Sequence, residues 1–242
     1  MNQRLVEDSS SFASVCVVIP TLGRSSLQRA AKSALSQTRK PNQMIIVNDG
    51  PAPLDLDVDE FGVDFRVVEG ERRGASAARN QGVSEAVTDW IAFLDDDDAW
   101  RPDKLELQLE GQSYQEQVVL SCGARVHVGG SLRFRPHSWF PPDLDVLGAF
   151  FGTRRFGGSS FYLPTPSFVV PSRIARKVPF DETLSLREDI WWLHQLQVLG
   201  IRIVQFPEYL VEVYTSVRRN NQHNSEDSQL RWAAKLESWD PE

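Results

Sequence analysis

Short apolar runs alternate with longer, mainly polar segments up to about residue 115 of the chain. Four of these runs predict strands, and two of them, Val15–Ile19 and Met44–Val47, predict strands buried on both faces because they are continuous and rich in β-branched residues. The four runs are Val15–Ile19, Met44–Val47, Phe65–Val68 and Trp90–Leu94. The segments between them predict helices, and this alternation is typical of a parallel sheet with covering helices.

Turn and capping residues indicate where the helices of this first part begin. Ser25 or Ser26 can cap the first helix, because a serine hydroxyl can accept a hydrogen bond from an unpaired N–H of the first turn. Gly74 precedes an alanine-rich segment, and Pro102 suits the first position of a further helix. We predict the three helices over residues 26–37, 75–86 and 102–110.

The rest of the chain is less regular. Val118–Val128 predicts one or two strands, whereas residues 129–165 are rich in glycine, proline and aromatic residues and have weak periodicity. The further expected elements are a strand at Ser167–Val170 with a turn at 171–172, a helix at Glu188–Leu199 closed by Gly200, strands at Ile201–Phe206 and Leu210–Tyr214, a polar loop or tail at Ser216–Asp227 and a short helix at Gln229–Glu237. We therefore expect one α/β domain with a mixed second half.

Four adjacent carboxylates, Asp95 to Asp98, directly follow the fourth apolar run. Such a cluster repels itself unless water or a cation screens it. The run lies where a parallel strand ends, which is the edge at which open α/β sheets bind ligands. Carboxylate oxygens suit Mg²⁺ or Mn²⁺, which can also bind substrate phosphates. The alternative is a solvated acidic turn, with Asp98 capping the helix that follows.

Composition narrows the class of protein. The 242 residues carry a net charge of −7, which gives no basic footprint for nucleic acid and implies that a phosphate ligand would need a cation or local arginines. Cys16 and Cys122 lie far apart, and a reducing cytoplasmic location fits them best. No apolar run has the length of a membrane span, and Met1–Ser14 lacks the apolar core of a signal peptide. Peripheral attachment to a membrane stays open.

Three ordered groups of motifs give the chain a family resemblance. They are Val17–Thr21 with Ala34–Thr38, then Ile45–Gly50, then Gly74–Gly82 with Phe93–Pro102. In this order and spacing they resemble the family 2 inverting glycosyltransferases of GT-A fold. The resemblance implies a Rossmann-like, mostly parallel central sheet flanked by helices, with a smaller mixed region on the acceptor side. It divides a single domain, residues 1–242, into a nucleotide-sugar half at 15–115, an acceptor and catalytic-base half at 116–215, and a tail at 216–242 that could act as a lid.

The resemblance also implies roles for individual residues. The donor-binding residues it implies are Thr21, Asp49, Arg79, Asp95 and Asp96. Asp95 and Asp97 form a D-x-D pair, with Asp97 placed on a divalent metal, Mn²⁺ or Mg²⁺. Asp189, within Arg187-Glu188-Asp189, is the implied catalytic base.

Each of these roles has a structural alternative. Asp49 can accept a hydrogen bond from the N–H of a pyrimidine base, but it can equally form an Asx turn at Asn48-Asp49-Gly50. Arg79 can reach a phosphate or a base carbonyl as a fork of donors, and a salt bridge to the acidic run is compatible with that role. Asp189 can simply favour the N-terminus of its helix electrostatically.

Weaker candidates complete the expected site. They are Arg24, Asn80, Gly158, Glu188, Trp191, Arg218 and His223. Trp191 could stack on an acceptor, whereas Arg218 and His223 lie in the tail that could close over a diphosphate. Asn48 stands where many relatives carry an aspartate, and the Gln-x-x-Arg-Trp pattern of processive relatives is absent from the sequence. The absence of that pattern indicates transfer of a single sugar.

The expected function is therefore inverting, metal-dependent transfer of one sugar from a nucleoside diphosphate sugar, most simply a UDP-sugar, to an acceptor hydroxyl of unspecified class. A sugar nucleotidyltransferase is one alternative, although Pro20–Arg24 lacks the glycine-rich phosphate loop of such enzymes. A catalytically inactive nucleotide-sugar-binding module is another. A dinucleotide oxidoreductase is disfavoured, because no G-x-G-x-x-G follows the first strand.

Overall fold

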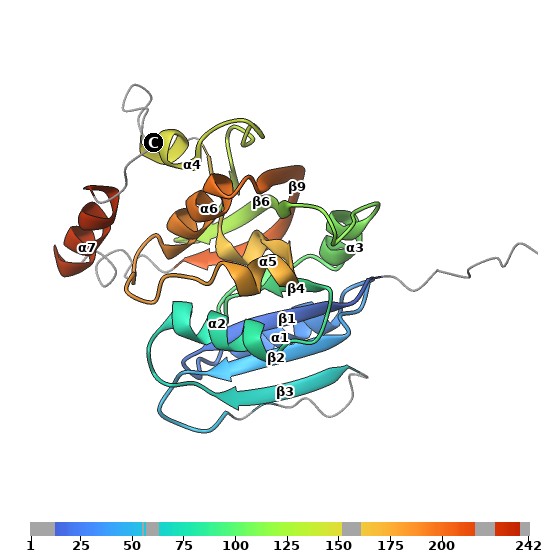
Figure 1. Ribbon diagram of the computed structural model, residues 1–242. Coiled ribbons are helices and arrows are strands. Elements are labelled where there is room, and N and C mark those ends of the chain that lie inside the picture. The colour runs from blue at the N-terminus through green and yellow to red at the C-terminus, as the bar shows by residue number, and fades with distance from the viewer. Residues whose placement is uncertain (1–12, 55, 57–62, 152–160, 216–225, 238–242) are drawn as a thin grey trace, which may run out of the picture.

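The computed structural model describes residues 13–54, 56, 63–151, 161–215 and 226–237 (Figure 1). Within these residues, nine strands form one mixed sheet in the order β3-β2-β1-β4-β8-β6-β9-β5, with β7 paired to β6. Helices cover both faces of this sheet. The expected α/β class is confirmed.

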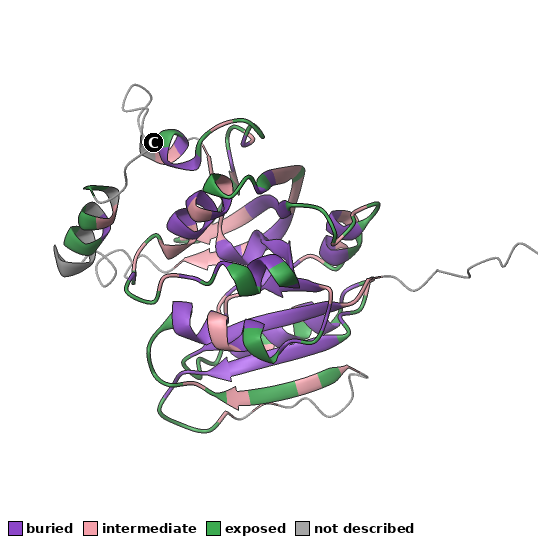
Figure 2. Ribbon diagram, viewed as in Figure 1, coloured by how far each residue is buried: buried purple, intermediate pink, exposed green. Residues whose placement is uncertain are grey.

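The first half follows the sequence pattern closely. Its strands are β1 (Val15–Thr21), β2 (Gln43–Asn48), β3 (Asp64–Glu69) and β4 (Trp90–Phe93). β1 pairs in parallel with both β2 and β4, and β2 pairs in parallel with β3. Figure 2 shows β1, β2 and β4 fully buried, whereas the edge strand β3 is mostly exposed. The continuous apolar runs thus mark the strands that are covered on both faces.

The helices of this half are α1 (Leu27–Leu35), α2 (Ala75–Glu85) and α3 (Lys104–Leu109). α3 begins two residues later than predicted, so Pro102 precedes the helix rather than occupying its first position. Asp103 has φ −97° and ψ 5°, outside the helical region, and the Pro102 carbonyl accepts a hydrogen bond from the Thr38 N–H at 2.8 Å. A tertiary contact has therefore overridden the local proline signal.

The second half departs further from the prediction. β6 (Val118–Val128) and β9 (Arg202–Thr215) are single long strands that pair in parallel, with register shifts on either side of Gly123. The two late strands predicted separately are thus one strand, because a bulge lets the pairing continue through Pro207. β8 (Val169–Pro171) pairs antiparallel with β4 and β6 and joins the two halves. The short strand β5 (Ala99–Trp100) pairs antiparallel with β9.

Several elements were not predicted. The irregular stretch contains β7 (Ser131–Arg135) and α4 (Val146–Phe151), and the turn expected at 171–172 is instead the start of α5 (Ser172–Lys177). These elements are only five or six residues long, too short for a periodic signal. The predicted later helices are present as α6 (Glu188–Val198) and α7 (Glu226–Glu237), and Gly200 has the expected positive φ of 75°.

Two apolar cores lie on the opposite faces of the sheet. One contains Phe93 and Trp192 together with residues of α2, α5 and α6, and the other contains Trp90 and Leu105 with residues of α1 and α3. α2 approaches the sheet closely, since a Cβ on Gly82 would lie 2.4 Å from a Val18 methyl group. Among the described helices, none combines the length and apolar character that a bilayer crossing requires.

Candidate active site

The carboxyl ends of β1, β2 and β4 meet at one edge of the sheet (Figure 1). Residues at and after these strand ends line a cavity of about 620 Å³. The cavity lining includes Thr21, Asp49, Arg79, Asp95, Asp96, Asp97 and Glu188. Seven residues from three strand ends, α2 and α6 that were singled out in the sequence therefore surround one space. Arg24 also lines it, but Asp189, Asn80 and Trp191 are not among its lining residues. Gly158, Arg218 and His223 lie outside the described residues.

Asp49 organises the loop that leads into α2. Its carboxylate accepts the backbone N–H groups of Arg72 at 2.6 Å and Gly74 at 2.7 Å. The Asx turn considered for this segment is made by its neighbour instead, because Asn48 Oδ1 accepts the Gly50 N–H at 3.2 Å. Each carboxylate oxygen carries more than one lone pair, so the buried Asp49 can still accept a bond from a ligand.

Asp96 anchors the acidic turn to β1. Thr21 Oγ1 donates to one of its oxygens at 2.6 Å, and Arg24 Nη1 donates to the other at 2.5 Å. Asp96 is buried, so these charge-assisted bonds offset the cost of removing its charge from water. Arg24 therefore belongs to the site, where its side chain is 42% exposed.

Arg79 joins the two halves of the molecule. Its guanidinium lies 2.7 Å from Asp95 Oδ1 and 3.1 Å from Glu188 Oε1, and its side chain is only 4% exposed. Burial alone would lower the pKa of Arg79, but the two carboxylates outweigh burial and raise this pKa above its ordinary value. The guanidinium is thus a fixed positive charge between the acidic turn and the N-terminus of α6, as the salt-bridge alternative anticipated.

Asp97 and Asp98 take different positions. Asp97 lines the cavity, and its Oδ2 lies 4.0 Å from Arg24 Nη1. Asp98 does not cap the following helix: it is buried and accepts the backbone N–H of Tyr214 in β9 at 3.0 Å. The chain turns into β5 directly after Asp98, which brings this carboxylate against β9. Burial and the nearby charge of Asp95 raise the pKa of Asp98.

The fit of a divalent metal can be assessed from these carboxylates. Among the described residues, no group of three or more His, Cys, Asp or Glu side chains forms a preassembled metal cage. Asp96 is engaged by Thr21 and Arg24, whereas Asp95 and Asp97 both face the cavity. Mg²⁺-like ions are often held by one or two carboxylates together with substrate phosphates, and this donor set fits that mode.

Asp189 lies in the first turn of α6. The preceding Arg187 has φ 57° and ψ 26°, a left-handed conformation that is uncommon for a side-chain-bearing residue. Asp189 Oδ1 accepts the N–H of Ile190 at 2.8 Å. Burial, followed by the charge of Glu188, raises the pKa of Asp189 to about 7. A carboxylate with such a pKa is suited to exchange a proton near neutral pH.

Two of the weaker candidates have structural roles. Asn80 holds the loop before α6, because its side chain bonds the carbonyl and the N–H of Phe180 at 2.9 and 2.8 Å. Trp191 is 8% exposed and packs edge-on against Trp232 of α7 at 6.0 Å, so its ring lies in the core instead of facing an acceptor. The residue pattern of α6 could not predict the contact between Trp191 and Trp232, because α7 is distant from α6 in sequence.

Sequence reasoning missed Arg231 as a cavity residue, and it interpreted Arg73, which also lines the cavity, as a surface charge. Arg73 pairs with Glu182, which also lines the cavity, and Arg231 reaches the cavity from α7. α7 is held nearby by the Trp191–Trp232 contact and by an ion pair between Lys235 and Asp181 at 2.7 Å. No local motif marks Arg231, since its place depends on this long-range docking.

The α/β fold and the carboxylate-rich cavity at the sheet edge define a glycosyltransferase of GT-A fold. The family model described as glycosyl transferase family 2 matches residues 16–184, and the chain belongs to this family. The resemblance stated from the motifs is therefore confirmed.

Individual relatives cover the chain to different extents. It is 26% identical over 227 residues to the amylovoran biosynthesis glycosyltransferase AmsB of Erwinia amylovora, covering 88% of this chain and 73% of that protein. It is 35% identical over 102 residues to the putative teichuronic acid biosynthesis glycosyltransferase TuaG of Bacillus subtilis, covering 40% of each. The shorter match spans under half of both proteins.

Solved structures support the fold. S. aureus TarS 1-349 in complex with UDP-GlcNAc has a TM-score of 0.63 at 15% identity, covering 95% of this chain and 68% of that one. The complex of the same protein with UDP has a TM-score of 0.60 at 14% identity, covering 84% and 61%. At these identities the likeness establishes the GT-A fold and not the substrates.

Proposed function

We propose that this protein transfers one sugar, with inversion, from a UDP-sugar to an acceptor hydroxyl, using a divalent metal. The observation that carries the proposal is the single cavity in which Asp49, Arg79 and the acidic turn meet. The structures of a GT-A neighbour with UDP and UDP-GlcNAc support a nucleotide-sugar donor. Biosynthesis of a glycan, glycoconjugate or natural product in the cytoplasm is the context that this reaction suggests.

In this proposal the donor lies along the edge of the sheet. Asp49 accepts the imide N–H of uracil, and Thr21, Asp95 and Asp96 lie beside the ribose. Arg79 offers its remaining donor capacity to the donor while holding Asp95 in place. The fixed ion pairs support the proposal because a rigid site loses little entropy when the donor binds.

Asp97, with Asp95, would hold Mn²⁺ or Mg²⁺ against the diphosphate. The bound metal would act as a Lewis acid that neutralises the charge of the leaving diphosphate. Asp95 accepts a bond from Arg79, and Asp97 Oδ2 lies 4.0 Å from Arg24 Nη1, so each carboxylate would be shared between the metal and an arginine.

Asp189 would take the proton from the acceptor hydroxyl as its oxygen attacks the anomeric carbon. Inversion requires a single in-line displacement, with the base and the leaving diphosphate on opposite faces of the sugar. The raised pKa of Asp189, about 7, supports this role because the ionised form remains available at neutral pH while being basic enough to accept a proton.

Calorimetry of UDP binding with and without Mn²⁺ tests the donor site. We expect Mn²⁺-dependent binding that is lost in Asp97→Ala and retained in Asp64→Ala, a control on the exposed edge strand β3. Metal-dependent binding that survives Asp97→Ala would contradict the metal assignment. Release of UDP from a UDP-sugar indicates a glycosyltransferase, whereas release of pyrophosphate from UTP and a sugar 1-phosphate indicates a nucleotidyltransferase. Binding with neither transfer nor slow hydrolysis would indicate an inactive module.

A further inference from the structure

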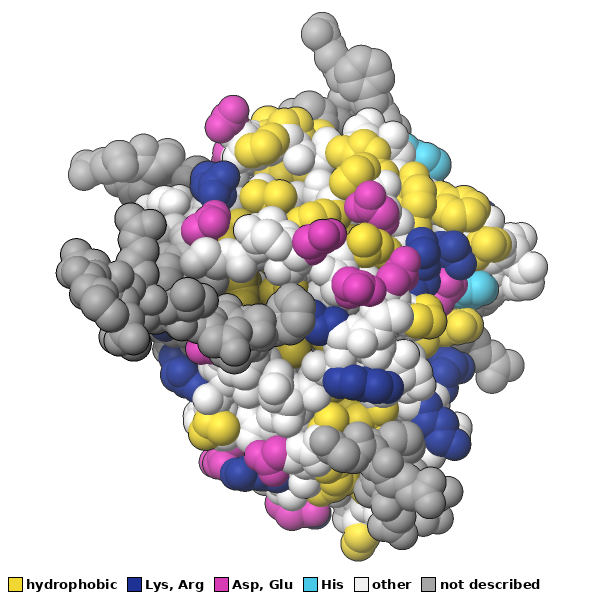
Figure 3. Space-filling view, turned by 90° about the vertical axis from the view of Figure 1, so that its right-hand side faces the viewer, with side chains coloured by type: hydrophobic (Ala, Val, Ile, Leu, Met, Phe, Trp, Pro, Cys, Tyr) yellow, Lys and Arg dark blue, Asp and Glu magenta, His cyan; other side chains and the backbone are white. Residues whose placement is uncertain are grey.

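A second hollow, of about 530 Å³, lies beside β7. It is lined by Arg133, Phe134, Arg135, Pro136, His137 and Tyr209. No carboxylate of the described residues pairs with Arg133 or Arg135, whereas Arg125 on the neighbouring strand is paired with Glu212 at 3.0 Å. Figure 3 shows Lys and Arg side chains beside Asp and Glu side chains on one face of the molecule, so the net charge of −7 is a sum over regions of both signs.

Aromatic rings form one wall of this groove. Tyr209 contacts Phe134 and Trp139, with ring centroids 5.0 and 5.4 Å apart, and Phe134 is 46% exposed. The cluster depends on Gly123, because a Cβ there would lie 2.6 Å from the Tyr209 ring and 3.0 Å from the Trp139 ring. The bulge between β6 and β9 thus brings these rings together at the groove.

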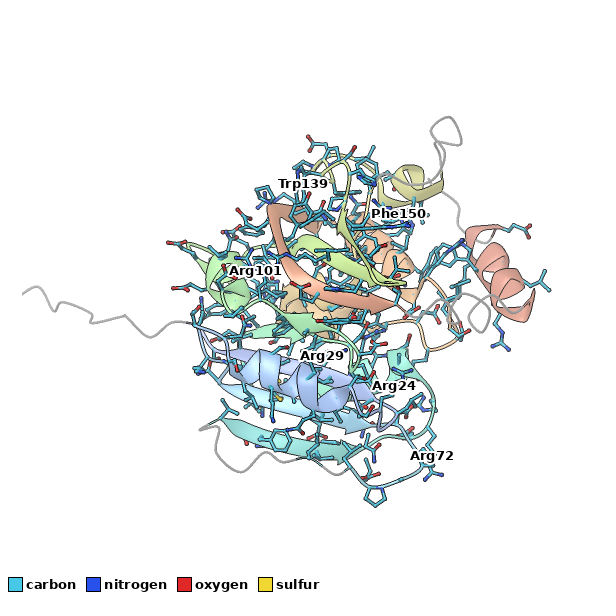
Figure 4. The ribbon with its side chains drawn as sticks, turned by 180° about the vertical axis from the view of Figure 1, so that it is seen from behind. Arg24, Arg29, Arg72, Arg101, Trp139 and Phe150 are labelled. Atoms are coloured by element: carbon cyan, nitrogen blue, oxygen red, sulfur yellow. The ribbon has the colours of Figure 1, made fainter. Side chains whose placement is uncertain are left out.

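The groove is linked to the catalytic edge through the sheet. β7 pairs with β6 and β6 pairs with β9. β9 meets the acidic turn where the Tyr214 N–H donates to Asp98 at 3.0 Å. The segment next to the groove is tied to β9, since Gln205 donates to the Tyr162 carbonyl at 2.9 Å and accepts the N–H of Phe140 at 2.8 Å. In Figure 4 Trp139 lies above the β6–β9 layer, and Arg24 and Arg29 lie below it.

We propose that the β7 groove binds an acceptor saccharide that carries a carboxylate or a phosphate group. This inference rests on the proposed function and names the acceptor class for that same reaction. Guanidinium groups bind carboxylates and phosphates through paired, charge-assisted hydrogen bonds, and aromatic faces stack on sugar rings. Arg133 and Arg135 supply the first kind of group and Phe134 and Tyr209 the second, in a space of saccharide size.

Binding of soluble probes tests this proposal without an activity assay. The probes are trigalacturonic acid, a trisaccharide of glucose that carries one phosphate, and the corresponding neutral trisaccharides, each titrated in the presence of UDP and Mn²⁺. We expect an acidic probe to bind about tenfold more tightly than its neutral counterpart, the discrimination expected of one charge-assisted contact. The preference should fall to about one in Arg133→Gln and Arg135→Gln, as expected when the charge-assisted contact is removed.

Arg66→Gln on β3 is the matched control, because Arg66 is exposed and distant from the groove along the sheet. Equal binding of acidic and neutral probes, or a preference that survives both groove variants, would overturn the proposal. Arginine-dependent binding to vesicles of anionic phospholipid without binding of any free acidic probe would also overturn it, in favour of a membrane surface. UDP binding measured in the same samples reports on the donor site separately, so either proposal can fail alone.

Discussion

The donor edge and the β7 groove use charged residues in opposite ways. At the donor edge the carboxylates of Asp95 and Asp96 are held by arginines of the protein itself, and Asp49 is fixed by backbone N–H groups. In the groove, Arg133 and Arg135 carry no carboxylate partner among the described residues. The first region is built to keep one geometry, whereas the second keeps charge available for a ligand. The comparison predicts that substitutions at the edge affect chemistry and stability, and that substitutions in the groove affect selectivity.

Asp189→Asn is the sharpest way to separate chemistry from donor binding. Asparagine keeps the shape of the side chain and can still accept the Ile190 N–H, but it cannot take a proton. We expect UDP release from UDP-sugars to slow by about 10²–10⁴-fold, the usual contribution of a general base, while UDP affinity stays within about twofold. Steady-state rates and calorimetry check the two parts, with Asp64→Asn as the control. Equal rates for Asp189→Asn and the unmodified protein would exclude Asp189 as the base.

Arg79→Met breaks the link between the two halves. It leaves Asp95 and Glu188 without their shared cation in a largely buried setting. We expect a loss of about 3 kcal/mol in the free energy of unfolding, at the lower end for a broken buried pair because both carboxylates are partly exposed. Urea denaturation measures it. Arg66→Met removes the exposed pair with Asp64 and should cost about 0–1 kcal/mol. Equal effects of the two substitutions would contradict the bridging role of Arg79.

The same comparison shows what the sequence can predict. In the donor half, β1, β2 and β4 are buried on both faces, so their apolar runs were sufficient to place them and the acidic turn that follows. The sequence predicted a salt bridge from Arg79 to the acidic run but not the pair of Arg79 with Glu188, because these two residues are 109 positions apart. The positions of Asp98, Trp191 and Arg231 could not be read from sequence, since each is decided by β9 or α7 packing from afar.

Gly123→Ala tests the aromatic wall of the groove. The added methyl group would meet the rings of Tyr209 and Trp139, so the aromatic wall must shift. We expect a loss of about 1–3 kcal/mol in unfolding free energy, typical of overpacking, together with weaker binding of acidic trisaccharides and unchanged UDP affinity. Thermal or urea unfolding and the probe titrations measure both. Gly130→Ala is not a neutral comparison because Gly130 has φ 77°, so Ser131→Ala at the start of β7 serves as the control.

The smallest predicted effect is the pH dependence of Asp189. Its pKa is raised from the ordinary value of 3.8 to about 7, so at pH 7 about half of the folded molecules carry the ionised base. Between pH 6 and pH 7, kcat/KM should rise about fivefold as the base ionises.

The same pKa shift makes folding stability fall as pH rises, whereas kcat/KM rises. Below 3.8 both the folded and the unfolded states are protonated at Asp189, and stability is unaffected by this group. From 3.8 to about 7 the unfolded chain ionises first, so the contribution of Asp189 lowers stability as pH rises, and above about 7 the loss is constant. Glu188→Gln sharpens the test, because removing the charge that helps to raise the pKa of Asp189 should move the rising limb of the rate profile to lower pH. If the rising limb of the rate profile stays at the same pH in Glu188→Gln, the limb reports the ionisation of a group other than Asp189.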